Sequence, residues 1–410
     1  MFYSITHKHT KQQIQEENGN ATLPLHITYD YSSIKKIFST AAFKKTPVSH
    51  LKYQLLYPIK PGYYKSLSLL EGNTPLHRSI CLGKTINLHN LYFKHEGMNP
   101  TGAFKDRGSI IEVLKAIEYK AKGMVLASTG NMAASVSAYS KRAKIPCSVF
   151  VPETAAKAKL SQALFYGAKI VKIRGNYDQA AKLAEQTAHE YGLYLAGDYA
   201  FRTEGQKSQA YEIIEQLNFN IPDYVVVPVG NGTNIVAIWK GFQDYFTMGL
   251  INKIPKMIAV EVESHNAVAK AFNAHDLSIE THLPEASQST VASAIAVRNP
   301  SDGNKTLALL KASGGFAISV KESDILSTQI TLASKESLFV EPSSAVVYAG
   351  IKKLVKQGKV AHSATVVCIL SGHGLKDPLS ALEKLPKENI IDPNFPAVKK
   401  LFEKQKWVKK

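Results

Sequence analysis

The chain has 410 residues, of which 45% are hydrophobic, and a formal net charge of +17. This length supports one or two hydrophobic cores, which excludes a small scaffold held together by disulfides or metal ions. The three cysteines, Cys81, Cys147 and Cys368, stand far apart without a Cys-x-x-Cys pair, so we expect neither disulfides nor a metal site.

The N-terminal segment, residues 1–20, is polar and lacks the apolar core of a secretory signal. No apolar run approaches the roughly 20 residues that a membrane span requires. We therefore expect a soluble, cytoplasmic protein. Residues 1–90 carry few periodic signals and are expected to form an N-terminal arm over the main sheet.

From about residue 90 to residue 370, strand-like apolar runs alternate with longer amphipathic segments, which predicts an α/β protein with a largely parallel sheet. The predicted strands are 124–128, 148–152, 169–173, 224–229, 257–261 and 364–370. The predicted helices among them are 132–143, 155–166 and 177–191. A loop-rich region, 275–289, is expected to cover a site.

Segment 99–108, Asn-Pro-Thr-Gly-Ala-Phe-Lys-Asp-Arg-Gly, places Lys105 after a Pro/Gly turn and at the start of a predicted helix. The partial positive charge of a helix N-terminus favours the neutral, nucleophilic form of a lysine. Schiff-base chemistry needs that form. A single lysine in so basic a chain is more often a solvated loop residue, but the whole string favours a functional lysine.

Segment 227–235, Val-Pro-Val-Gly-Asn-Gly-Thr-Asn-Ile, reads as a strand, a glycine-rich turn and the start of a helix. Backbone N–H groups at such a helix start converge on an anion, and the glycines let a phosphate approach. The segment is neither a Walker A loop nor Gly-x-Gly-x-x-Gly. A purely structural turn is the alternative, and the position after a buried strand favours phosphate binding.

Two further turns follow predicted strands: 128–132, Ser-Thr-Gly-Asn-Met, and 371–377, Ser-Gly-His-Gly-Leu-Lys-Asp. In an open α/β sheet, ligands lie at the carboxyl ends of the strands. The first turn could face a carboxylate or a ring oxygen. In the second, His373 belongs to a residue type that more often packs or caps than acts as an acid or base.

Together these strings resemble the fold-type-II pyridoxal-phosphate (PLP) enzymes, and among them the threonine synthases. The resemblance covers most of the chain from about Ser66 onward, and successive segments match in order: 70–76, 166–175, 202–208, 290–295 and 339–345. It implies two open, mostly parallel sheets flanked by helices. The implied division is an arm (1–90), a large PLP-binding domain (91–108 and 206–390), a small domain (109–205) and a basic tail (391–410).

The resemblance also implies roles for single residues. Lys105 would hold PLP as a Schiff base, with Phe104 beside the ring. Asn131 would hydrogen-bond the phenolic oxygen, and Ser371 would face the pyridine nitrogen, where the family usually has Thr. The cofactor phosphate would be held by Gly230, Asn231, Gly232, Thr233 and Asn234.

The implied reaction converts O-phospho-L-homoserine and water to L-threonine and phosphate by β,γ-elimination and replacement. Lys105 would move protons at Cα, Cβ and Cγ. The substrate carboxylate would be bound by Ser128, Thr129 and Asn131, and the substrate phosphate would be bound by Arg202.

The chain departs from the family at the expected substrate-phosphate contacts. Met132 stands where the family generally has Thr, and Ala196-Gly197 stand where it has Asn-Ser. Arg202 and Lys207 could compensate, and Asp198 and Tyr199 add a carboxylate and a phenol nearby. Local packing changes are the alternative explanation.

Three hypotheses for the function remain open. The first is threonine synthesis; the second is a PLP-dependent serine/threonine dehydratase (ammonia-lyase) or a cysteate-synthase-like β-replacement enzyme. The third is a non-catalytic binding module, which the presence of Lys105 disfavours.

The positive charge is spread along the chain and is concentrated only in 398–410, which we interpret as a solvated helical end. No nucleic-acid-binding motif accompanies it. The expected partner is a small anionic amino-acid substrate, with neither nucleic acid nor membrane, and analogy within the fold suggests a homodimer. Segment 27–30, Ile-Thr-Tyr-Asp, has none of the cysteines found near it in many threonine synthases, so the arm is expected to be metal-free.

Overall fold

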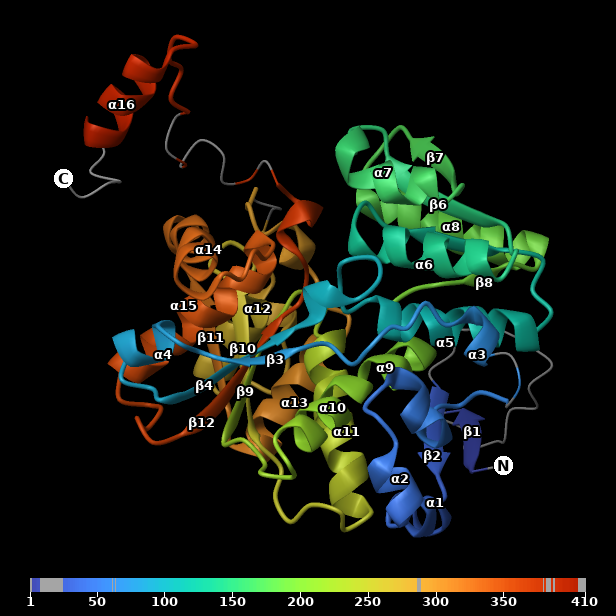
Figure 1. The fold of residues 1–410 in the computed structure, drawn as a ribbon. Coiled ribbons are helices and arrows are strands. Elements are labelled where there is room, and N and C mark those ends of the chain that lie inside the picture. The colour runs from blue at the N-terminus through green and yellow to red at the C-terminus, as the bar shows by residue number, and fades with distance from the viewer. Residues whose placement is uncertain are drawn as a thin grey trace.

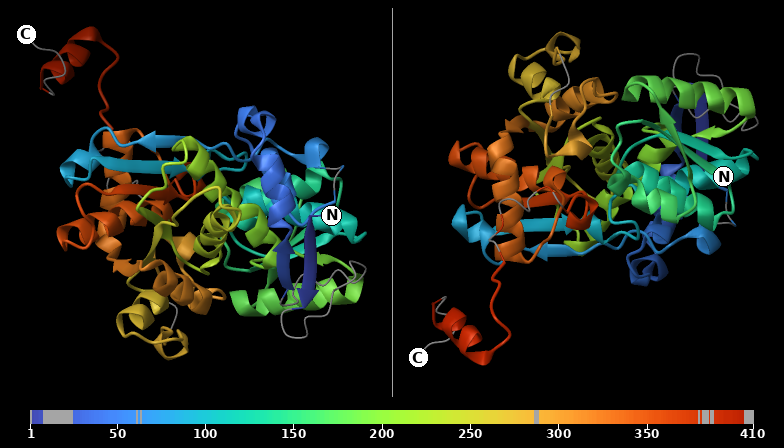
Figure 2. Two further views of the ribbon diagram at one scale, coloured as in Figure 1. Left: turned by 90° about the horizontal axis from the view of Figure 1, so that it is seen from below. Right: turned by 90° about the horizontal axis from the view of Figure 1, so that it is seen from above.

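The computed structural model describes residues 2–7, 25–60, 62, 64–285, 289–378, 380, 385 and 388–404. Parts of three predicted regions lie outside this range: most of the N-terminal segment 1–20, residues 286–288 of the loop-rich region, and the last six residues of the basic tail. In the described residues the strands form three sheets, and helices flank the two larger ones (Figure 1, Figure 2).

The larger sheet has six strands. Neighbouring strands run parallel except for the antiparallel pair of β3 and β4. Across the sheet the order is β11 (Phe316–Val320), β10 (Lys256–Val262), β9 (Tyr224–Pro228), β12 (Thr365–Leu370), β4 (Asn90–His95) and β3 (Leu76–Arg78). Every residue of β9 is buried, as expected of a parallel strand covered on both faces.

The smaller sheet has four parallel strands. Their order is β7 (Lys169–Ile173), β6 (Cys147–Pro152), β5 (Met124–Ala127) and β8 (Tyr194–Leu195). The helices between them are α6 (Asn131–Arg142), α7 (Lys157–Phe165) and α8 (Tyr177–Tyr191). The sequence predictions for β7 and α8 are confirmed to the residue, and the other predicted elements agree within one or two residues at each end.

An N-terminal arm packs against the larger part of the fold. It contains the antiparallel pair β1 (Tyr3–His7) and β2 (Leu25–Tyr29), followed by α1 (Tyr31–Phe38) and α2 (Ala41–Lys45). The predicted arm, residues 1–90, was too long, because β3 pairs with β4 inside the six-stranded sheet. A three-residue edge strand is too short to show a period in the sequence.

Polar contacts hold this arm in place. The Tyr29 hydroxyl donates to Glu204 and the Tyr31 hydroxyl to Asp244, each at 2.6 Å. The Lys207 Nζ lies between the same two carboxylates, 2.7 Å from Glu204 and 2.8 Å from Asp244. Two tyrosines of the arm are therefore tied to a buried ion cluster of the main fold.

The remaining helices complete the two layers, and α16 stands apart from the body of the molecule (Figure 1, Figure 2). No helix among the described residues is long and apolar enough to cross a bilayer. Their bounds are α3 (Tyr64–Leu67), α4 (Leu82–Thr85), α5 (Asp106–Glu118), α9 (Ala200–Gln206), α10 (Ser208–Gln216), α11 (Thr233–Thr247), α12 (Ala267–Asn273), α13 (Gly303–Ser313), α14 (Glu322–Glu336), α15 (Pro342–Lys356) and α16 (Phe395–Lys404), with 3-10 turns at His50–Leu56, Glu96–Met98, Glu280–His282, Ser293–Ile295 and Gly374–Lys376.

A buried ion cluster fixes the start of α5. The guanidinium of Arg107 is fully buried and binds Glu96 (2.6 and 2.8 Å) and Glu212 (both contacts 2.7 Å). Lys94 Nζ also donates to Glu212 at 2.7 Å. Burial alone would raise the pKa of Glu212, but the charges of Arg107 and Lys94 hold it well below its usual range. The cluster therefore joins β4, α5 and α10.

Replacing Glu212 by Ala should lower the free energy of unfolding by about 3–5 kcal/mol, because it leaves the buried Lys94 without a carboxylate partner and Arg107 with Glu96 alone. Urea denaturation measures this change. The matched control is Lys253→Ala, which breaks the ion pair with Asp223, where the two side chains are 54% and 45% exposed. That substitution should cost no more than about 1 kcal/mol, and equal losses in the two variants would contradict the account.

Candidate active site

The sheet topology brings the predicted site segments together. Strands β9 and β12 are parallel neighbours, so the turns that follow them, 229–234 and 371–377, lie at the same edge of the sheet. The lysine segment reaches this edge through two backbone hydrogen bonds: Phe104 N donates to the Ser371 carbonyl (3.0 Å), and His373 N donates to the Gly102 carbonyl (2.9 Å). Lys105 is thus placed beside the turn that contains Ser371.

Lys105 immediately precedes α5, and its side chain remains 17% exposed. Its Nζ lies 5.0 Å from the centre of the Phe104 ring. The next residue, Asp106, is fully buried and accepts hydrogen bonds from Thr101 N (2.7 Å) and Ser135 Oγ (2.6 Å). Burial raises the pKa of Asp106 to about 6. With Asp106 and Arg107 both locked in the interior, Lys105 is the member of this Lys-Asp-Arg string that faces the site.

Asp198 connects Lys105 to the glycine-rich loop. Its Oδ1 accepts a hydrogen bond from Lys105 Nζ at 3.0 Å, and its Oδ2 accepts one from Asn231 Nδ2 at 2.8 Å. Burial alone would raise the pKa of Asp198, but Lys105 and Arg202 hold it below its usual value. The sequence drew attention to this carboxylate without giving it a role, because nothing local shows that it meets a lysine 93 residues away.

Glu341 connects Asn131 with Ser371. Its carboxylate accepts hydrogen bonds from Asn131 Nδ2 (3.0 Å) and from Ser371 Oγ (3.2 Å), and the Ser344 hydroxyl lies 2.9 Å from that of Ser371. Burial raises the pKa of Glu341. Sequence reasoning missed this residue, although it lies within the matched segment 339–345.

The glycine-rich loop fits a phosphate group. Gly232 has a φ of +88°, and a Cβ atom there would come within 2.5 Å of Thr306 Oγ1. Directly after it, at the start of α11, Thr233 Oγ1 and Asn234 Nδ2 are buried without a hydrogen-bond partner in the described part of the chain. Buried polar atoms are rarely left unpaired, and a helix N-terminus favours an anion. These atoms therefore suit a phosphate ligand.

Two buried glutamines, Gln206 and Gln209, were not among the residues predicted from the sequence, and one of them contacts this loop. Gln209 Nε2 donates to Asn234 Oδ1 at 2.7 Å, which orients the Asn234 amide. Gln206 is fully buried, and neither of its amide atoms has a partner among the described residues. A glutamine inside a helix carries no sequence signal that distinguishes contact with a ligand-binding loop from ordinary packing.

The residues predicted to contact the substrate, Ser128, Thr129 and Arg202, differ in burial. Ser128 and Thr129 are half-buried after β5, and Ser128 Oγ accepts a hydrogen bond from Gly130 N at 3.3 Å. Arg202 is fully buried: it contacts Glu112, and its Nε donates to the Gly197 carbonyl at 2.8 Å. Burial raises the pKa of Glu112 to about 7, against the opposing effect of Arg202. The Arg202 guanidinium therefore binds groups inside the protein, namely Glu112 and the Gly197 carbonyl.

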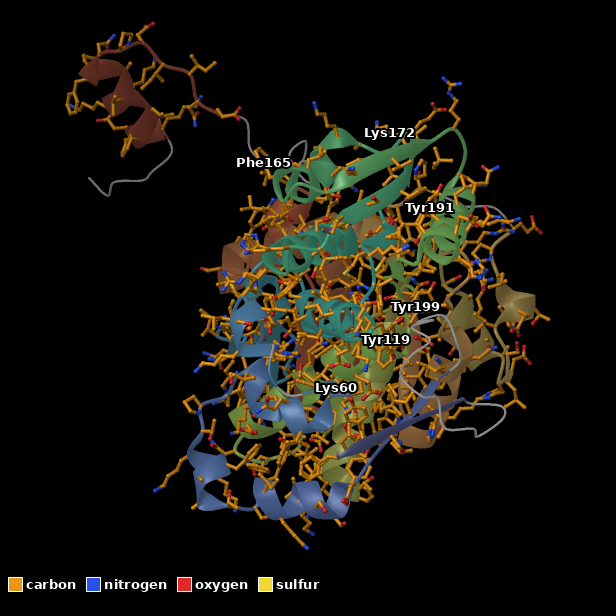
Figure 3. The ribbon with its side chains drawn as sticks, turned by 90° about the vertical axis from the view of Figure 1, so that its right-hand side faces the viewer. Lys60, Tyr119, Phe165, Lys172, Tyr191 and Tyr199 are labelled. Atoms are coloured by element: carbon orange, nitrogen blue, oxygen red, sulfur yellow. The ribbon has the colours of Figure 1, made fainter. Side chains whose placement is uncertain are left out.

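The positions that depart from the family are apolar or tightly packed. Met132 is half-buried against the core, and Ala196 is buried. A Cβ atom on Gly197 would come within 2.5 Å of the Tyr199 ring, which lies at the face shown in Figure 3. Lys207, expected to compensate, is fully buried between its two carboxylates. Its amine is thus paired with Glu204 and Asp244, the carboxylates that also bind the tyrosines of the arm.

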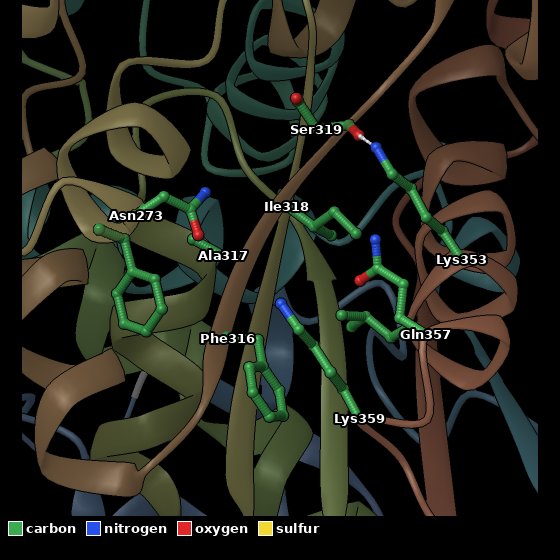
Figure 4. Close-up of a pocket in the computed structure, with 10 residues that line it drawn as sticks. Asn273, Phe316, Ala317, Ile318, Ser319, Lys353, Gln357 and Lys359 are labelled. Atoms are coloured by element: carbon green, nitrogen blue, oxygen red, sulfur yellow. Dashed lines mark hydrogen bonds between the residues drawn. The ribbon is translucent and has the colours of Figure 1, made fainter.

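A shallow recess of about 200 Å³ lies elsewhere, between edge strand β11 and helices α12 and α15 (Figure 4). Its lining includes Phe316, Ile318, Lys353, Gln357 and Lys359. None of the predicted site residues lines it. Among the described residues, no group of three or more His, Cys, Asp or Glu side chains is arranged to hold a metal ion.

Comparisons with known proteins identify the family of the chain. The family model for "pyridoxal-phosphate dependent enzyme" matches residues 67–372. The chain therefore belongs to the pyridoxal-phosphate-dependent enzyme family, and its cofactor is pyridoxal 5'-phosphate. Within that family it is similar to threonine synthases: it is 41% identical to that of Methanocaldococcus jannaschii over 92% of this chain and 93% of the relative. It is 40% identical to that of Methanosarcina acetivorans over 93% of each.

Solved structures support the fold alone. Threonine deaminase isoform 2 from Solanum lycopersicum matches with a TM-score of 0.66 and 21% identity, covering 82% of this chain and 91% of its own. Maize serine racemase matches with a TM-score of 0.63 and 22% identity, covering 82% and 93%. The predicted fold class, a fold-type-II α/β enzyme, is confirmed, and the chain is a PLP-dependent lyase of this fold.

Gly232→Ala should weaken PLP binding by at least about tenfold, because a left-handed φ costs an L-residue roughly 1–2 kcal/mol and the new Cβ crowds Thr306. Fluorescence titration of the cofactor-free protein with PLP measures the affinity. Gly358→Ala is the matched control, since Gly358 also has a positive φ, +69°, but open space around it. Its affinity should match that of the unsubstituted protein; equal weakening in both variants would show that backbone strain, and not the loop, is responsible.

Proposed function

We propose that this enzyme converts O-phospho-L-homoserine and water to L-threonine and phosphate, with Lys105 as the lysine that binds PLP. The proposal rests on the position of Lys105 between the Ser371 turn and the glycine-rich loop. Its partly exposed amine lies at the sheet edge beside the Ser371 turn and is joined through Asp198 to Asn231 of the glycine-rich loop. Threonine synthases about 40% identical along almost the whole chain support the same reaction.

The cofactor, when bound, supplies an electron sink that makes the hydrogens on the substrate carbons acidic. The chain supplies the groups around it. Thr233, Asn234 and the N–H groups of the loop would hold its phosphate, Asn131 its phenolic oxygen, and Ser371 its ring nitrogen. Ser128 and Thr129 would bind the substrate carboxylate. Lys105 would then carry protons between the substrate carbons.

A second candidate function rests on the residues at the positions expected to contact the substrate phosphate. Met132, Ala196 and Gly197 offer no side-chain donor there, and Arg202 reaches a substrate only after its pair with Glu112 opens. This favours a shorter substrate: a β-replacement enzyme such as a cysteate synthase exchanges a leaving group on Cβ for sulfite, and a dehydratase removes the hydroxyl of serine or threonine.

A substrate comparison distinguishes these candidates. O-phospho-L-homoserine should release phosphate and threonine in equal amounts, and Lys105→Ala should slow this release by about 10²- to 10⁴-fold. Phosphate and cysteate formed in equal amounts from O-phospho-L-serine and sulfite, while O-phospho-L-homoserine is inert, would establish the β-replacement. Keto acid formed from serine or threonine would instead establish the dehydratase.

A further inference from the structure

Asp198 is a carboxylate in direct contact with the reacting amine, and the proposed function gives it no role. Its side chain is 13% exposed, so it is reachable from the site, and its Oδ1 lies 3.0 Å from Lys105 Nζ. The other oxygen is held by Asn231 at 2.8 Å. One oxygen is therefore anchored to the loop, while the other faces the lysine.

The other acidic groups of the site have different partners. Glu112 contacts Arg202 and the Gly197 N–H, and Glu341 contacts Asn131 and Ser371. Within the described part of the chain, Asp198 is the carboxylate that hydrogen-bonds to Lys105. The lowered pKa of Asp198, caused by Lys105 and Arg202 against the effect of burial, keeps it ionised at neutral pH.

An amino acid enters an enzyme as an ammonium ion and must lose a proton before its nitrogen can displace a lysine. The entering nitrogen bonds to the carbon that the lysine nitrogen leaves. A carboxylate in contact with one nitrogen is therefore within reach of the other, and an ionised carboxylate can accept the proton.

We propose that Asp198 carries the proton between the entering substrate amine and Lys105 during this exchange, an inference that rests on the assignment of Lys105 in the proposed function. Asp198 Oδ1 accepts a proton from the substrate ammonium; the substrate nitrogen then bonds to the cofactor carbon as the bond to Lys105 breaks. This proton and a second proton of the substrate nitrogen pass through Asp198 to Nζ, which holds one proton in the protonated linkage and therefore leaves as an ammonium. The charge and the number of protons are the same on both sides of the exchange.

The contact between free Lys105 and Asp198 in the structure is the one that the released ammonium would make. The carboxylate would stabilise that ammonium and can later take its proton back. Lys105 is then a neutral amine, which can act on the substrate carbons. Anchoring by Asn231 keeps Asp198 in place throughout.

The test compares two kinds of entering amine in the PLP-loaded protein, by stopped-flow absorbance of the lysine-bound cofactor. One is O-phospho-L-homoserine or O-phospho-L-serine, whichever changes the spectrum of the unsubstituted protein faster, and it arrives as an ammonium. The other is methoxyamine, which is already neutral at pH 7. Asp198→Asn should slow displacement by the amino acid about 100-fold and leave displacement by methoxyamine close to its original rate.

Added acetate should restore part of the lost rate in Asp198→Ala. Asp178→Asn, at an exposed position in the first turn of α8, is the control and should change neither rate. Equal slowing with both amines, or loss of the cofactor from Asp198→Asn, would overturn the proposal and make Asp198 a structural residue. Failure of the proposed function is seen separately, because it appears in the products formed and not in the contrast between the two amines.

Discussion

The buried pairing of Arg107 with Glu96 and Glu212 is the constraint on which the site depends. Arg107 stands two residues after Lys105, and four hydrogen bonds to two carboxylates fix it in the interior. Because its partners come from the end of β4 and from α10, the start of α5 cannot shift without breaking the cluster. A buried cluster of this kind contributes little net stability but is costly to break, so its main effect is to hold Lys105 at the edge of the sheet.

From that fixed point, polar bridges extend to the rest of the site. Asp198 joins the lysine to the glycine-rich loop, and Glu341 joins the turn after β5 to the turn after β12. The bridged turns come from both sheets, since β5 belongs to the smaller one and β12 to the larger. Asp198 thus connects Lys105 to Asn231, and Glu341 connects Asn131 to Ser371. Thr233 Oγ1 and Asn234 Nδ2 stay unpaired among the described residues.

Much of the fold and several site residues could be predicted from the sequence, because hydrophobic spacing and turn motifs are local patterns. Strand β7 and helix α8 follow from their hydrophobic spacing, and the strings around Lys105 and Gly232 carry their own turn chemistry. Asp198, Glu341 and Arg107 could not be assigned their most distant partners, which lie 93, 210 and 105 residues away in the chain. The sequence also does not show that Arg202 and Lys207 form ion pairs with buried carboxylates. These pairs weaken the expectation that the two side chains bind a substrate phosphate.

Borohydride reduction shows whether Lys105 is the lysine that binds the cofactor. The PLP-loaded protein is reduced, digested and analysed by mass spectrometry. The added mass of the reduced cofactor is expected on the peptide that contains Lys105. Lys376 lies nearby, with its amine 2.9 Å from the Thr101 carbonyl and its pKa lowered by burial. Cofactor attached to Lys376, or to any lysine other than Lys105, would contradict the assignment of Lys105.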